Sequence, residues 1–86
     1  MKLNFYTVFD KAVGAYMRPF VMQSDGQAVR HFEDEVNGDN PIAKHPEDYA
    51  LFRIGMFDDQ SGELIPEECQ CLRRAHEVVK KEKEDA

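Results

Sequence analysis

The chain has 86 residues, 42% of them hydrophobic, with six Phe and three Tyr, so it is long enough for one small domain and too apolar to be disordered throughout. Its net charge of −6 opposes binding to a polyanion unless the cations gather on one surface. The charge is uneven, with net +2 in residues 1–30, −9 in residues 31–68 and +1 in residues 69–86.

The first third of the chain predicts a β-hairpin. Residues 3–9 are rich in aromatic and β-branched side chains, which is typical of a strand. Residues 16–23 predict a second strand. Pro19 lies within it and lacks a backbone donor, so we expect this strand at a sheet edge or at a bulge.

A helix is predicted after this hairpin. Ser24 is a suitable N-cap, and Gln27, three residues later, completes a capping box. Asn37 and Gly38 supply the C-terminal stop. One face of this helix is apolar and carries Ala28, Val29, Phe32 and Val36.

The second half predicts two more strands and a second helix. Residues 39–48 contain two prolines and are expected to be an irregular connector, whereas residues 49–58 are apolar on both faces and predict a central strand. A short strand is expected at residues 63–65. Pro66 then suits the first turn of a helix, whose apolar stripe would be Leu72, Ala75, His76 and Val79.

These elements predict a small α+β domain with the order ββαββα. About four antiparallel strands would form the sheet and two helices would accompany it. We expect one domain over residues 1–82, with residues 83–86 frayed.

No motif predicts catalysis, a metal or a cofactor. The spacing of Cys69 and Cys71 is not that of a zinc knuckle, and on the predicted helix the two thiols would point about 200° apart. His31 and Glu35, four residues apart, are interpreted as a solvated surface pair. We therefore expect no enzyme activity, no bound metal and no cofactor.

One face of the sheet is the candidate interaction surface. An open sheet face can bind single-stranded nucleic acid when aromatic rings stack on bases and cations meet phosphates. The candidate residues for DNA contact are Lys2, Tyr6, Lys11, Tyr16, Arg18, Arg30, Tyr49 and Arg53.

An ordered series of short segments carries a family resemblance. These segments are Tyr-Met-Arg-Pro-Phe at 16–20, Ser-Asp-Gly-Gln-Ala-Val-Arg-His-Phe at 24–32, Lys-His-Pro-Glu-Asp-Tyr at 44–49 and Gly-Met-Phe-Asp-Asp at 55–59, closing at Gly62. Over roughly residues 2–64 the chain resembles the small nonstructural proteins of gokushoviruses, single-stranded DNA phages of the microvirus family. The resemblance implies a role in viral single-stranded DNA synthesis and packaging, and it transfers no catalytic residues.

Two functions are possible as hypotheses. In the first, the protein binds single-stranded DNA or the replication complex on it, and a symmetric homodimer would double any basic patch. In the second, an acidic surface binds a basic viral or host protein without touching DNA. That surface would comprise Glu33, Asp34, Glu35, Asp58, Asp59, Glu67 and Glu68. No apolar run approaches membrane-spanning length, so we expect no membrane partner and a location in the cytoplasm of the infected bacterium.

Overall fold

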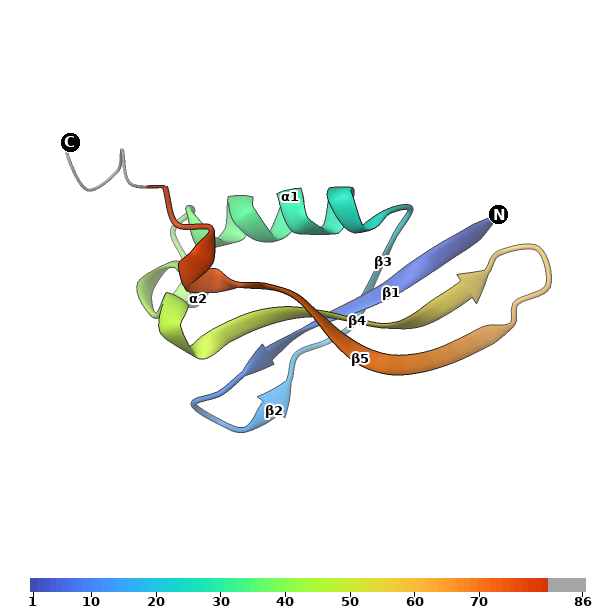
Figure 1. The fold of residues 1–86 in the computed structure, drawn as a ribbon, viewed down its shortest axis with the longest axis horizontal. Helices are drawn as coiled ribbons and strands as arrows, with labels where there is room; N and C mark the ends of the chain where they lie inside the picture. Colours follow the sequence, from blue (N-terminus) through green and yellow to red (C-terminus); the bar gives the residue numbers. More distant parts are fainter. Residues whose placement is uncertain (81–86) are drawn as a thin grey trace.

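A computed structural model describes residues 1–80 as an antiparallel sheet with one long helix packed across it (Figure 1). The strand order is β2-β1-β4-β5, and β3 also pairs with β1. The strands are β1 (Lys2–Asp10), β2 (Ala15–Tyr16), β3 (Phe20–Met22), β4 (Tyr49–Asp58) and β5 (Leu64–Arg74). The helices are α1 (Asp25–Val36) and α2 (Pro41–Lys44), with 3-10 turns at η1 (Pro46–Asp48) and η2 (Ala75–Glu77).

The long strands β1 and β4 form the centre of the sheet. They pair along their whole length, from Lys2 opposite Asp58 to Asp10 opposite Tyr49. The register shifts once, between Phe5 and Tyr6, and Ile54 is the extra residue on β4. After this bulge Tyr6 lies directly opposite Arg53, so both side chains leave the sheet on the same side.

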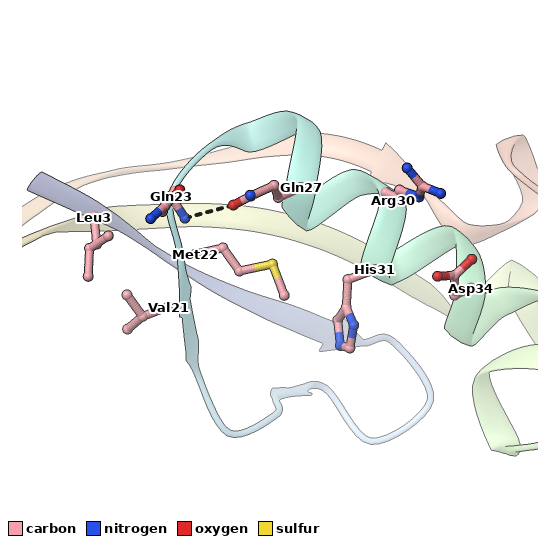
Figure 2. A pocket seen from close by; sticks show the side chains of 8 residues that line it. All are labelled: Leu3, Val21, Met22, Gln23, Gln27, Arg30, His31 and Asp34. Carbon is pink, nitrogen blue, oxygen red and sulfur yellow. Dashed lines mark hydrogen bonds between the residues drawn. The ribbon is translucent and has the colours of Figure 1, made fainter.

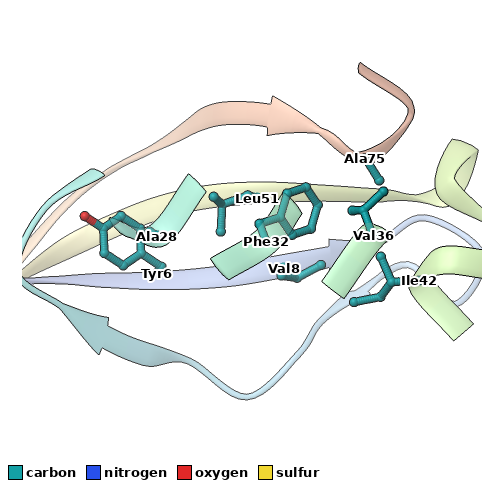
Figure 3. Close-up of a cluster of buried hydrophobic side chains, with 8 residues drawn as sticks. All are labelled: Tyr6, Val8, Ala28, Phe32, Val36, Ile42, Leu51 and Ala75. Atoms are coloured by element: carbon teal, nitrogen blue, oxygen red, sulfur yellow. The ribbon is translucent and has the colours of Figure 1, made fainter. Parts of the chain in front are cut away.

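Helix α1 begins where the sequence predicts. The Ser24 hydroxyl accepts a hydrogen bond from the Gln27 backbone N–H at 3.2 Å, and the Gln27 side-chain oxygen accepts from the Gln23 backbone N–H at 3.2 Å. The helix lays its apolar face on β1 and β4, and this contact makes the core (Figure 3). The buried core residues are Tyr6, Val8, Ala28, Phe32, Val36, Ile42, Leu51 and Ala75.

The α+β class and the antiparallel sheet are confirmed. The expected strand at 16–23 is interrupted around Pro19, and its two pieces both pair with β1. The connector at 39–48 is more regular than expected. It contains α2, whose N-cap Asn40 accepts a hydrogen bond from the Ala43 backbone N–H.

The helix predicted from Pro66 onward is wrong, because this segment continues as strand β5 to Arg74. Strand β4 has two edges, and β1 satisfies the backbone groups of only one of them. Pairing with β5 satisfies the backbone N–H and C=O groups on the other edge of β4. This long-range pairing outweighs the helical pattern of the segment. The apolar residues of the expected stripe still reach the core, with Ala75 buried and Leu72 and Val79 packed against it. The expected fraying of residues 83–86 lies outside the described residues.

Because this segment is a strand, the side chains of the two cysteines also point in other directions than predicted. Cys69 and Cys71 are two positions apart on a strand, so they point to the same side rather than about 200° apart. Both are exposed free thiols.

Candidate functional site

The two faces of the sheet differ in what covers them. Helix α1 lies over the side chains of Tyr6, Val8 and Leu51, and in the described part of the chain no helix lies on the opposite side (Figure 1). Because side chains alternate along a strand, Phe5 and Phe9 of β1 point to that opposite side, as does Phe52 of β4. We call this side the open face.

Aromatic rings gather at two places on the open face. Tyr16 packs against Phe9 with ring centroids 4.8 Å apart and against Phe52 at 5.8 Å. We call Phe9, Tyr16 and Phe52 the aromatic cluster. A second pair, Phe5 and Phe57, meets edge to face at 6.2 Å.

The surface between these rings is apolar and partly exposed. Pro19 and Ile54 line two shallow hollows of about 340 and 360 Å³, one running toward Tyr16 and the other toward Leu64. Tyr16 is 51% exposed and Leu64 is 62% exposed. This exposed apolar surface makes the open face a candidate interaction site.

Tyr6 and Arg53, expected on the same sheet face as Tyr16, leave the sheet on the side that α1 covers. Tyr6 is fully buried beneath α1, and its hydroxyl donates to Asp25 Oδ1 at 2.7 Å. Arg53 Nη1 donates to Asp25 Oδ2 at 2.6 Å, and its Nε lies 3.4 Å from Glu67. Burial, and then the hydrogen bond to Asp25, raise the pKa of Tyr6 to about 12. These two residues tie α1 to the sheet.

The other predicted contact residues are scattered. Lys2 and Lys11 lie at opposite ends of β1, roughly 30 Å apart at about 3.4 Å per residue. Tyr49 packs against the core on the covered side, and burial followed by the nearby Asp10 raises its pKa. Arg30 is exposed on α1.

Arg18 is exposed in the loop between β2 and β3 and lines a hollow beside Phe32 on the helix side. Tyr16 and Lys11 therefore remain as predicted residues at the open face. Sequence reasoning missed Phe5, Phe9 and Phe52. The even spacing of Phe5 and Phe9 in the first strand already indicated that these two rings share one face.

The acidic residues of the second hypothesis do not share one surface. Glu33, Asp34 and Glu35 lie on α1, whereas Asp58 and Asp59 lie at the turn between β4 and β5.

Several of these acids have structural partners. Asp59 accepts from the N-terminal ammonium of Met1 at 2.7 Å. Hydrogen bonds from the turn backbone, that of Gln60 first, lower the pKa of Asp58. Glu67 is held beside Arg53, and Glu68 is exposed on β5.

A wider hollow of about 620 Å³ lies between β3 and α1 (Figure 2). No Phe or Tyr lines it, and its helix side carries Arg30, His31 and Asp34, which mix both signs of charge. Gln23 and Gln27, also on its wall, are hydrogen-bonded to each other. This hollow offers fewer recognition features than the open face.

Among residues 1–80, no group of three or more His, Cys, Asp or Glu side chains is placed to hold a metal ion. No helix in the same range is long and apolar enough to cross a bilayer.

The fold defines a small α+β domain with one covered and one open sheet face. The family model described as Phage ORF5 protein matches residues 3–78, and the chain belongs to this family. The match continues past Ile65 through β5, beyond the segments that carried the resemblance. No curated protein and no solved structure matches the chain.

Proposed function

We propose that this phage protein binds single-stranded DNA on its open face, without catalysing a reaction, during viral genome synthesis and packaging in the cytoplasm of the infected bacterium. The aromatic cluster of Phe9, Tyr16 and Phe52 carries the proposal. Every base has a π-face, and stacking on a protein aromatic contributes about 1–3 kcal/mol per base. Tyr16 is half exposed, so a base can reach its ring.

Two cations near the cluster support this assignment. Lys11 and Arg74 are exposed beside Phe9 and Phe52, and neither forms an ion pair with a described residue. The acids Glu33, Asp34 and Glu35 belong to α1, on the other side of the sheet. These three acids are therefore remote from the open face, whereas Glu47 and Asp48 line the same cleft as Lys11 and Arg74. A two-fold dimer would double the number of aromatic clusters per assembly.

The test is fluorescence anisotropy of a labelled oligo-dT at low and at physiological salt, with a duplex of the same length as comparison. We expect binding to the single strand that weakens with salt, with a slope of about −0.7 for each phosphate contacted. Tyr16→Ser should weaken binding about 5- to 150-fold, whereas Tyr16→Phe keeps the ring and should bind like the natural protein. Absence of binding at low salt, or equal loss in both variants, would reject the proposal.

The net charge of −9 in residues 31–68 favours a second candidate, an acidic module that binds a basic viral or host protein. On this reading α1 is the contact surface, because Asp34 is exposed there with Glu33 and Glu35 beside it. Asp34→Lys would then abolish co-purification of a basic phage protein from infected cells. The same variant would leave oligo-dT anisotropy unchanged from that of the natural protein.

A further inference from the structure

A cleft of about 450 Å³ opens at one end of the open face, where β1 ends and β4 begins. Its volume lies within the range of roughly 300–1,000 Å³ typical of small-ligand sites. Part of its frame is fixed by the backbone, because the Lys11 N–H donates to the Asp48 carbonyl at 2.8 Å and so joins the end of β1 to η1.

The cleft has an apolar part to its lining, which we call its floor. Ala50, Phe9 and Phe52 line it, and both rings also contact Tyr16 in the aromatic cluster. The cleft is therefore continuous with the surface on which the proposed function places the DNA strand. A planar heterocycle can lie against such a floor by stacking on the rings.

The rim of the cleft carries both kinds of polar partner that a nucleotide needs. Lys11 and Arg74 are exposed on it, and guanidinium and ammonium groups bind phosphate oxygens. Glu47 and Asp48 supply carboxylate oxygens at the same cleft. A carboxylate accepts a hydrogen bond from the exocyclic amino group of cytosine, and thymine has no such donor.

We propose that this cleft binds one unpaired nucleotide of the DNA strand, with its base against Phe9 and Phe52 and its phosphate at Lys11 and Arg74. The carboxylates at the rim make it prefer an amino-bearing base to thymine. This inference rests on the proposed function and adds to it a defined subsite and a base preference.

Strand β5 offers a matched pair of variants for the test. Arg74 pairs with Ala50 and lines the cleft, whereas its neighbour Arg73 pairs with Leu51, which is buried beneath α1. Paired residues point to the same side, so Arg73 leaves the sheet on the covered side. Both arginines are exposed, and each replacement by alanine removes one positive charge from the same strand.

The experiment is a two-dimensional ¹H–¹⁵N NMR titration of the full chain with dCMP, dTMP and inorganic phosphate. We expect dCMP to shift the amides of Phe9, Ala50 and Phe52, and to bind at least fivefold more tightly than dTMP. Arg74→Ala should weaken dCMP binding at least fivefold, while Arg73→Ala should leave it within twofold of the natural protein.

Three results would overturn the inference. They are no shifts at the cleft with either nucleotide, the same shifts with phosphate alone, and equal losses in Arg73→Ala and Arg74→Ala. If oligo-dT still binds through Tyr16 in such a case, the proposed function stands and only the cleft assignment fails. If dCMP fills the cleft but neither oligo-dT nor oligo-dC of the same length binds, the proposed function fails instead.

Discussion

The sharpest structural prediction concerns the hydroxyl of Tyr6. It donates to Asp25 Oδ1 at 2.7 Å and accepts from Asn4 Nδ2 at 3.0 Å, so it joins β1 to the first turn of α1. Tyr6→Phe removes this hydroxyl and leaves the ring in the core beside Phe20. The variant therefore isolates the hydrogen bonds from the packing of the ring.

The expected loss in the free energy of unfolding can be estimated from these two hydrogen bonds. A hydrogen bond to a charged acceptor contributes about 1.5–3 kcal/mol and a neutral one about 0.5–1.5 kcal/mol. The Asp25 side chain is 39% exposed, so water replaces part of what Tyr6 supplied. We expect Tyr6→Phe to lower the free energy of unfolding by about 2 kcal/mol and the Tm by about 8–16 °C.

Urea denaturation and thermal melting, both followed by circular dichroism, measure this change. Tyr16→Phe is the control, because it also removes a phenolic hydroxyl but from a half-exposed ring on the open face. A Tyr6→Phe variant within about 0.5 kcal/mol of the natural protein, the range of an ordinary surface substitution, would refute the assignment of this contact as a structural tie.

The same hydroxyl also gives a prediction for pH. Folding raises the pKa of Tyr6 from 10 to about 12, so the unfolded chain loses this proton first as pH rises. The contribution of the protonated Tyr6 hydroxyl to the free energy of unfolding is complete below about pH 10 and is lost between about pH 10 and 12. It amounts to about 3 kcal/mol. Stability measured across this range should fall less steeply in Tyr6→Phe than in the natural protein, and parallel curves would contradict the prediction.

The remaining predictions concern the backbone and its turns. Gly55→Ala should destabilise the fold by about 1–3 kcal/mol, because a Cβ there would lie 2.6 Å from the Ile65 carbonyl oxygen. A Cβ at Gly26 in α1 meets only Ser24 Oγ at 3.9 Å, so Gly26→Ala should stabilise the fold by about 0.5–1 kcal/mol. The urea midpoints of the two variants measure both changes. Ser24→Ala removes the N-cap of α1 and should cost about 1 kcal/mol in the same assay. Because folding lowers the pKa of Asp58, its stabilising contribution is present above the pKa of the unfolded chain and is lost as pH falls through the folded value, so Asp58→Ala should show a weaker acid dependence of stability.

Local chemistry was enough to predict much of this molecule. The cap at Ser24, the apolar face of α1 and the alternation in residues 49–58 each act over a few residues, and the structure confirms the elements they predict. The α+β class results from these elements, because a half-apolar helix and an apolar sheet must bury their faces against each other.

Tertiary structure decided the conformation of the segment after Pro66 and the choice of the open sheet face. The apolar spacing around Leu72 fits a helix, but the unpaired edge of β4 makes the segment a strand. Both faces of β4 are apolar, so no local pattern shows which face α1 covers. The packing of α1 buries Tyr6 and pairs Arg53 with Asp25, and it leaves Phe9, Tyr16 and Phe52 on the other side. The candidate site therefore depends on long-range packing and strand register, which short-range sequence patterns do not encode.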